Sequence, residues 1–228
     1  MTEPAASAIA EPREVDRRWL VWVLAAALVV SVLGVVWLAV TRPPSTPGDG
    51  SVAAGFSRDM AAHHEQAVAM AEIIRDRTED AAIRLLATDI ALTQQSQIGR
   101  MRGWLDVWGL RPTGSTSRMA WMGEPTTGLM PGMAAATDVE RLRSAPLADA
   151  ENLFLSLMIE HHRAGVAMAQ AALDSSVPAE VATLARGIVT SQSSEIETLQ
   201  RMLADRGQAA PEISGTAPNS MDDDHGGG

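Results

Sequence analysis

The chain has 228 residues, a formal net charge of −10, no Cys and no Lys. Its length suits one modest domain with appendages, and the lack of Cys excludes disulfides and thiolate metal ligands. Residues 1–42 hold four acidic and four basic side chains, so residues 43–228 carry the whole negative excess. This balance argues against a nucleic-acid or other phosphate-binding surface.

An apolar segment near the N-terminus is long enough to cross a membrane. Residues 20–40 contain no charge, and about 20 apolar residues span the hydrocarbon core. Arg13, Arg17 and Arg18 precede the segment closely, whereas Arg42 alone follows it closely. The positive-inside rule then places the N-terminus in the cytoplasm and the remainder outside. The run is long for a cleaved signal peptide and no convincing cleavage site follows it, so we expect an uncleaved single-pass anchor.

The rest of the chain is typical of an all-α protein. Helical periodicity predicts helices over 52–77 and 80–109, a third from Pro146 to about 174, and a fourth that ends at Gly207. A capping-box pattern at Thr137–Glu140 predicts a short helix to about 143. The predicted organisation is a cytoplasmic N-terminus (1–18), a transmembrane anchor (19–41), a linker (42–51), a helical bundle (52–207) with a Met-rich loop (110–136), and a disordered tail (208–228).

The bundle is an internal repeat. Phe56–Gly109 aligns with Phe154–Gly207 without a gap at an offset of 98 residues, and 18 of the 54 aligned positions are identical. Each copy is a helical hairpin that buries one stripe of side chains, so the two copies most simply close into a four-helix bundle.

The shared residues include four of the five histidines in the chain. His63 and His64 lie on the apolar face of their helix, as do His161 and His162 in the second copy. Antiparallel pairing within each hairpin places residue 63 opposite about 94 and residue 161 opposite about 192. The facing stripes are interrupted by polar residues at these levels, which predicts one internal polar layer formed by His63, His64, Gln94, Gln97, His161, His162, Gln192 and Glu195. Adjacent residues point about 100° apart, so we expect one histidine of each pair to enter a shared site.

Such a layer has two interpretations. Buried polar groups need partners, and a hydrogen-bonded layer would fix the register of the bundle. A metal site is the alternative, because imidazole with thioether donors suits copper, and Cu(I) in particular. Zinc would not explain the methionines, and a di-iron centre needs Glu-x-x-His pairs that the chain lacks. The candidate metal ligands are His63, His64, His161 and His162, then Met60, Met70, Met158 and Met168, with Glu195 possible as well.

The Met-rich loop offers a second candidate site. Two Met-x-x-Met pairs could capture Cu(I), or their side chains could cover the end of the bundle as apolar filler. These residues are Met119, Met122, Met130 and Met133.

At these motifs the chain resembles the bacterial family known as domain of unknown function 305. The matching residues are Gly55–Met60, His63–Ala71, Gln94 with Ile98–Leu105, Met130–Met133 and Leu153–His162. The resemblance implies a ferritin-like bundle that is secreted or membrane-anchored, and it implies metal binding, since some members are linked to copper. It also leads us to expect a Glu where this chain has Gln97.

The leading hypothesis is a copper-binding or copper-buffering protein, not an enzyme, anchored in the bacterial plasma membrane with its bundle on the extracytoplasmic side. The expected partners are membrane lipid and a metal ion, with no nucleic acid. The alternative is a metal-free helical interaction module, or a subunit of a cell-envelope complex, in which the polar layer is purely structural.

Overall fold

The structure is a computed structural model that describes residues 18–41 and 46–207. All its regular elements are helices in these two ranges, which confirms the all-α class; an isolated bridge joins Arg118 and Thr126. Most of the predicted cytoplasmic segment, residues 42–45 of the linker and the 208–228 tail lie outside the described residues. The chain divides into one unit up to Ser45 and a second from Thr46 onward, and each is described separately.

The first unit contains one helix, α1 (Arg18–Thr41). Its window from Arg18 to Leu38 has a mean hydropathy of 2.6, and none of that window is buried within the protein. By length and composition α1 could therefore cross a membrane.

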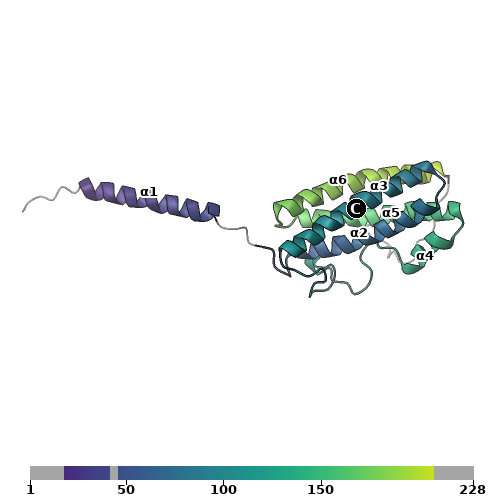
Figure 1. Ribbon diagram of the computed structural model, residues 1–228, viewed down its shortest axis with the longest axis horizontal. Coiled ribbons are helices and arrows are strands. Elements are labelled where there is room, and N and C mark those ends of the chain that lie inside the picture. Colours follow the sequence, from purple (N-terminus) through teal and green to yellow (C-terminus); the bar gives the residue numbers. More distant parts are fainter. Residues whose placement is uncertain (1–17, 42–45, 208–228) are drawn as a thin grey trace, which may run out of the picture. The chain divides into compact units, whose positions relative to one another are not determined.

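The second unit contains two long helical hairpins (Figure 1). The first pairs α2 (Val52–Arg77) with α3 (Ala81–Val107), and the second pairs α5 (Leu147–Leu173) with α6 (Ala179–Asp205). Between the hairpins lie a short 3-10 helix η1 (Ala120–Met122) and α4 (Ala136–Ser144). The predicted long helices agree with the structure to within about two residues at each end.

Local chemistry explains several helix ends. The Ser51 hydroxyl accepts from the Ala54 N–H at 3.2 Å, and the Asp80 carboxylate accepts from the Ala82 and Ile83 N–H groups, so α2 and α3 begin with side-chain caps. Gly109 and Gly207, equivalent positions of the repeat, have φ values of 69° and 64°. These left-handed residues follow α3 and α6, where glycine costs least.

The predicted capping box at α4 is wrong. The helix begins at Ala136, one residue before Thr137, and its N-cap residue Ala135 makes no side-chain hydrogen bond. The Ala135 carbonyl instead accepts from the Asp138 and Val139 N–H groups. Asp138, fully buried in the first turn, places a negative charge where the helix dipole favours one.

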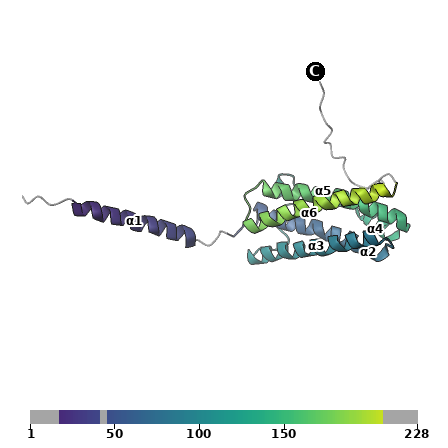
Figure 2. The same ribbon diagram turned by 90° about the horizontal axis from the view of Figure 1, so that it is seen from above.

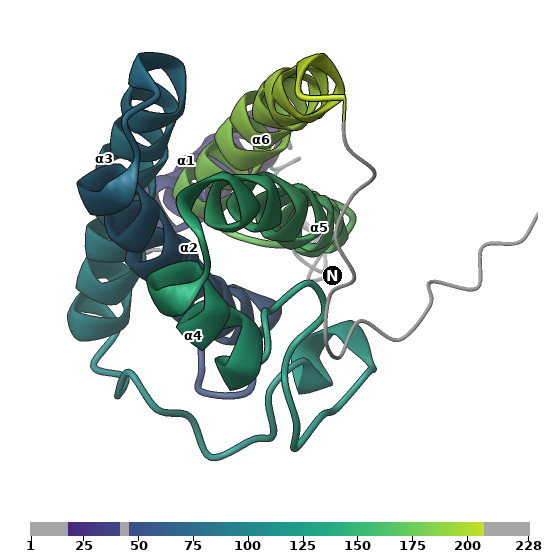
Figure 3. The ribbon, with the colours of Figure 1, turned by 90° about the vertical axis from the view of Figure 1, so that its right-hand side faces the viewer.

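Helices α2 and α5 form the central pair of the bundle. They contact each other, and each also contacts its hairpin partner. The end-on view shows α3 and α6 on one side of this pair, and α4 with the connecting segment (residues 108–135) on the other (Figure 3). The view from above shows the long helices running side by side along the bundle (Figure 2).

The apolar core is divided into two clusters along the bundle axis. The α4-side cluster includes Met70, Ile83, Leu142 and Met158, and the methionine-rich cluster includes Phe56 and Ile188. The second cluster takes its name from five buried methionines, Met60, Met101, Met119, Met130 and Met168. On each long helix the predicted polar residues lie between these two clusters, so a polar layer separates two apolar compartments.

Candidate metal centre

All four histidines of the repeat lie in this layer and have no exposed surface. Gln94 and Gln192 are almost fully buried as well, and Gln97 and Glu195 lie at the margin of the layer. We call the eight residues the histidine layer: His63, His64, Gln94, Gln97, His161, His162, Gln192 and Glu195. The structure thus brings together every polar residue that the helix faces predict, and buries both members of each His-His pair.

One histidine of each pair bonds within its own hairpin. His64 Nε2 lies 2.7 Å from Gln97 Oε1, and His162 Nε2 lies 2.6 Å from Glu195 Oε2. The two contacts are equivalent in the repeat, because both partners are offset by 98 residues.

The antiparallel pairing that sets residue 63 opposite about 94 also sets residue 97 opposite about 60, yet the Gln97 side chain bonds to His64, one helical turn further along α2. Side chains lean toward the N-terminus of their own helix. In an antiparallel pair, His64 and Gln97 therefore lean toward each other. The same reasoning accounts for the contact between His162 and Glu195.

The other two histidines join the repeats. The rings of His63 and His161 stack with their centroids 3.7 Å apart and their planes 33° apart. His161 Nε2 lies 2.9 Å from the His63 carbonyl oxygen, and His63 Nε2 lies 3.2 Å from the Pro131 carbonyl oxygen. The connecting segment thus supplies one contact that breaks the symmetry of the layer.

These partners indicate which nitrogen of each ring carries the hydrogen. Backbone carbonyls, the Gln97 amide oxygen and the Glu195 carboxylate all accept hydrogen bonds, so each Nε2 is the donor. A neutral imidazole then has an unprotonated Nδ1 with a free lone pair. All four Nδ1 atoms are buried, and none has a hydrogen-bond partner within the described part of the chain.

Burial keeps three of these rings, those of His63, His64 and His161, neutral. Removal from water lowers the pKa of His63 to about 4 and that of His64 to about 3, and it holds the pKa of His161 well below its usual value. At neutral pH these three histidines therefore present unprotonated nitrogen donors.

Gln94 and Gln192 add further unpaired groups. The oxygen and nitrogen atoms of both amides are buried without a partner among the described residues. Gln192 packs directly against Gly165, where a Cβ would lie 2.4 Å from Gln192 Oε1.

The candidate methionine ligands lie on both sides of the layer. Met60 and Met168 belong to the methionine-rich cluster, whereas Met70 and Met158 belong to the α4-side cluster. In the connecting segment, Met119 and Met130 are buried in the methionine-rich cluster, and Met122 and Met133 pack against it while partly exposed. Their packing role is therefore visible; a capture role stays a prediction.

The imidazole and thioether donors suit a soft metal ion that takes few ligands better than a hard ion that takes many ligands. Four buried imidazole lone pairs without partners are nitrogen donors ready for a metal. In the described ranges, however, no three His, Asp or Glu side chains come close enough together to hold one ion. Glu65 and Glu160 face away from the layer, toward solvent, where they pair with Arg102 and Arg163.

Sequence reasoning missed how the connecting segment closes the layer. Ala134 forms two hydrogen bonds with the Gln66 side chain, one turn after His63. Gly132 has φ 72°, and a Cβ there would lie 2.5 Å from Ala164 Cβ and 2.6 Å from the Glu160 carbonyl oxygen. The Met-Pro-Gly-Met pattern signals a turn, but it does not show which ring a backbone carbonyl will meet.

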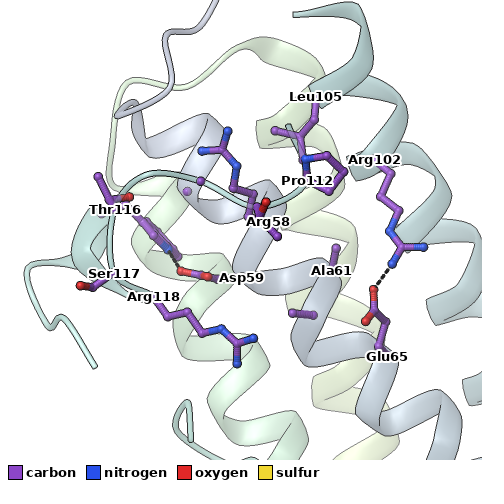
Figure 4. Close-up of a pocket in the computed structure, with 15 residues that line it drawn as sticks. Arg58, Asp59, Ala61, Glu65, Arg102, Leu105, Pro112, Thr116, Ser117 and Arg118 are labelled. Carbon is purple, nitrogen blue, oxygen red and sulfur yellow. Dashed lines mark hydrogen bonds and ion pairs between the residues drawn. The ribbon is translucent and has the colours of Figure 1, made fainter. Parts of the chain in front are cut away.

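A separate pocket of about 340 Å³ lies between α2, the C-terminal part of α3 and the connecting segment (Figure 4). Asp59 lines it, accepting hydrogen bonds from the Met119 N–H and Trp121 Nε1–H, and burial raises the pKa of its carboxyl. None of the four histidines lines this pocket.

Comparisons with known proteins match almost the whole second unit. The family model for the domain of unknown function DUF305 matches residues 53–203. A DUF305 protein from Streptomyces coelicolor, expected to be secreted, is 45% identical with a TM-score of 0.69, over 72% of this chain and 99% of that one.

Solved structures of CopM are also similar. The Cu(II)-bound form is 25% identical with a TM-score of 0.54, over 68% of this chain and 97% of that one. The Cu(I)-bound form is 27% identical with a TM-score of 0.50, over 66% and 94%.

A shorter similarity involves an uncharacterized protein, L153, of Acanthamoeba polyphaga mimivirus. It is 45% identical over 51 residues, which are 22% of this chain and about a third (34%) of that relative. The family model, in contrast, covers both hairpins, the histidine layer and the segment between them. The chain belongs to the DUF305 family.

Proposed function

We propose that this chain is a copper-binding or copper-buffering protein, held in the bacterial plasma membrane by α1 with its bundle on the extracytoplasmic side. No enzymatic role is part of the proposal. The bundle would hold the metal at the histidine layer, and the anchor would keep that site at the membrane surface.

The arrangement of the four imidazoles carries the proposal. A histidine that binds a metal through one nitrogen usually donates its other N–H to a carboxylate, a carbonyl or water. Each layer histidine donates its Nε2–H to a carbonyl, amide or carboxylate oxygen, and each Nδ1 lone pair is left without a protein partner. A buried polar atom without a partner costs about 1–3 kcal/mol. Nitrogen–metal bonds would remove that cost.

Donor softness favours copper, and Cu(I) over Cu(II). Imidazole suits several transition metals, whereas a nearby thioether favours Cu(I). Zinc and iron fit less well, because the layer holds one carboxylate and no trio of converging ligands in the described ranges. Support also comes from CopM, which has been solved with Cu(I) and with Cu(II).

The assigned roles follow this order. His63, His64, His161 and His162 are the primary ligands, and Met60, Met70, Met158 and Met168 are secondary. Glu195 orients His162 through its hydrogen bond in the apo arrangement, and it remains a possible direct ligand.

The test is metal titration of the full-length chain in detergent micelles. Competition with chelators of known affinity should show Cu(I) bound far more tightly than Zn(II). X-ray absorption at the copper edge should then show nitrogen ligands, with sulfur as well if the methionines take part. Binding of both ions at micromolar affinity or weaker would contradict the proposal.

A metal-free interaction module is the second candidate. It is favoured by the absence of three converging ligands in the described ranges and by the hydrogen bonds that already fix the layer. In that case the layer would serve only the register of the bundle, and weak binding of every metal tested would place this function first.

A further inference from the structure

The two halves of the histidine layer have the same geometry but different charge. Gln97 and Glu195 occupy equivalent positions of the repeat, and each accepts from the Nε2–H of its histidine at nearly the same distance, 2.7 and 2.6 Å. An amide and a carboxylate have almost the same shape. The halves therefore differ by one negative charge and by little else at this contact.

Other charges near the layer are neutralised elsewhere. Glu65 and Glu160, each next to a His-His pair, form ion pairs with Arg102 and Arg163 near the surface. Asp59, one turn before His63, accepts hydrogen bonds from the Met119 N–H and Trp121 Nε1–H. The positive charges of Arg58 and Arg118 also act on its carboxylate. Within the described ranges, Glu195 is the acidic side chain that bonds directly to a layer histidine.

We propose that the Gln97/Glu195 pair determines the charge of the metal that the layer accepts, and that holding one carboxylate instead of two at these positions favours a monovalent soft cation over a divalent one. This inference rests on the proposed copper-binding function. With neutral histidines, one monovalent ion and one carboxylate sum to zero, whereas a divalent ion leaves a net positive charge. An uncompensated charge in a buried site is unfavourable.

The carboxylate also makes the two histidines unequal ligands. A carboxylate that accepts the imidazole N–H raises the basicity of the other ring nitrogen. His162 should therefore be a stronger donor than His64, whose partner is a neutral amide.

The experiment changes the number of carboxylates and leaves the hydrogen-bond geometry in place. Full-length Gln97→Glu, Glu195→Gln and the double exchange Gln97→Glu/Glu195→Gln are titrated in micelles beside the unmodified chain. Ag(I) and Zn(II) serve as probes of fixed charge, because neither changes oxidation state under these conditions, and Cu(I) is measured in parallel. Each variant has the same set of histidines and methionines, so a change in the Ag(I)/Zn(II) affinity ratio reports the number of carboxylates and not a change in the nitrogen and sulfur donors.

Gln97→Glu should lower the Ag(I)/Zn(II) affinity ratio about tenfold or more, because a second unit of negative charge near a partly buried site favours the divalent ion. Glu195→Gln should raise this ratio and weaken the binding of both ions, because it removes the negative charge of Glu195. The double exchange keeps one carboxylate and should restore the original ratio within about threefold. Circular dichroism of the apo-proteins checks folding. If Gln97→Glu does not fold, the Ag(I)/Zn(II) ratios of Glu195→Gln and of the double exchange decide whether the number of carboxylates sets the preference.

Ratios that stay within about threefold of the original in both single variants would overturn the inference and leave the copper proposal standing. The inference would also be overturned if the double exchange, which has one carboxylate at position 97, failed to restore the original Ag(I)/Zn(II) ratio within about threefold. The ratio would then depend on the position of the carboxylate and not on the number of carboxylates. Failure of the unmodified chain to bind Ag(I) and Cu(I) would instead refute the proposed function itself.

Discussion

Each histidine of the layer uses its one ring hydrogen on an oxygen acceptor, which leaves Nδ1 as a bare donor. A glutamine side chain can copy the Nε2–H group of histidine but not the Nδ1 lone pair. Substitution by glutamine therefore separates the register role of a ring from its metal role.

His64→Gln combined with His162→Gln should abolish tight Cu(I) binding. Each new amide can still donate toward Gln97 or Glu195, so the free energy of unfolding of the apo-protein should fall less than in the His64→Ala/His162→Ala variant. The alanine pair strands buried acceptors, at about 1–3 kcal/mol each. Chelator competition and urea denaturation measure the two effects. His225→Ala, which removes the fifth histidine of the chain, is the matched control, and retention of tight binding in the glutamine pair would refute the ligand assignment.

Acid should destabilise the apo-bundle. Burial lowers the pKa of His63 to about 4 and that of His64 to about 3, whereas unfolded histidines titrate near 6.5. Between these values the unfolded state binds more protons than the folded state, so the free energy of unfolding falls as the pH falls from about 6.5 toward 4. The slope is up to about 1.4 kcal/mol per pH unit for each such histidine.

Urea midpoints of the apo-protein at about pH 7 and pH 5 test this slope. Asp59 acts in the opposite sense, because burial raises the pKa of its carboxyl, so the histidine contribution needs its own control. His64→Gln should show a shallower loss of stability than the unmodified chain. Equal slopes in the two proteins would mean that His64 is not a buried neutral ring in the apo state.

At the scale of the elements, the four long helices could be predicted because a 3.6-residue periodicity, the Asp80 cap and the glycines at 109 and 207 all agree. The polar layer could be predicted for the same reason, since Gln94 and Gln192 interrupt apolar stripes. The acceptor for His63 could not be predicted, because it is the backbone carbonyl of Pro131. Every residue type has such a carbonyl, so the sequence does not show which one will accept the hydrogen bond. The start of α4 was also missed, since backbone bonds replace the cap expected from Thr137.

Gly132→Ala should detach the connecting segment from α5. A Cβ would collide with Ala164 and the Glu160 carbonyl, and the φ of 72° disfavours any side chain. We expect a loss of about 1–3 kcal/mol and faster hydrogen exchange of the Ala134 N–H, which is bonded to Gln66. Gly128→Ala is the control, because a Cβ at Gly128 would have Thr126 Oγ1 as its nearest neighbour, at 3.7 Å, and the φ of Gly128 is not positive. Equal effects of the two substitutions would refute the packing argument.

The methionines of the connecting segment allow a test of the capture site. Replacing Met119, Met122, Met130 and Met133 by Leu keeps most of the volume, so the fold should survive at a cost below about 1.5 kcal/mol per site. If the four sulfurs capture metal, Cu(I) uptake should weaken while Cu(II) binding stays nearly intact. Stopped-flow uptake and equilibrium titration distinguish the outcomes, and unchanged Cu(I) kinetics and stoichiometry would leave these side chains with packing alone.

At the scale of the whole molecule, a helix long and apolar enough to cross a membrane precedes the unit that carries the layer. The positive-inside rule acts through basic residues close to the segment. Arg13, Arg17 and Arg18 on the N-terminal side outnumber Arg42 on the other. The histidine layer should therefore meet copper outside the cytoplasm.

A reporter fused after Gly228 tests this orientation. A periplasmic-type alkaline phosphatase fused there should be active and a fluorescent protein that folds only in the cytoplasm should be dark, because the C-terminal side of α1 is expected outside. Replacing Arg13, Arg17 and Arg18 by Gln removes the charge bias, so a larger fraction of chains should insert in the opposite direction. The same replacement of Arg75, Arg84 and Arg100 in the bundle, far from the segment in sequence, should not change the orientation.

Mass spectrometry of the membrane fraction should recover the chain with residues 19–41 attached. Recovery of a soluble species that begins after residue 40 would instead identify the segment as a cleaved signal peptide.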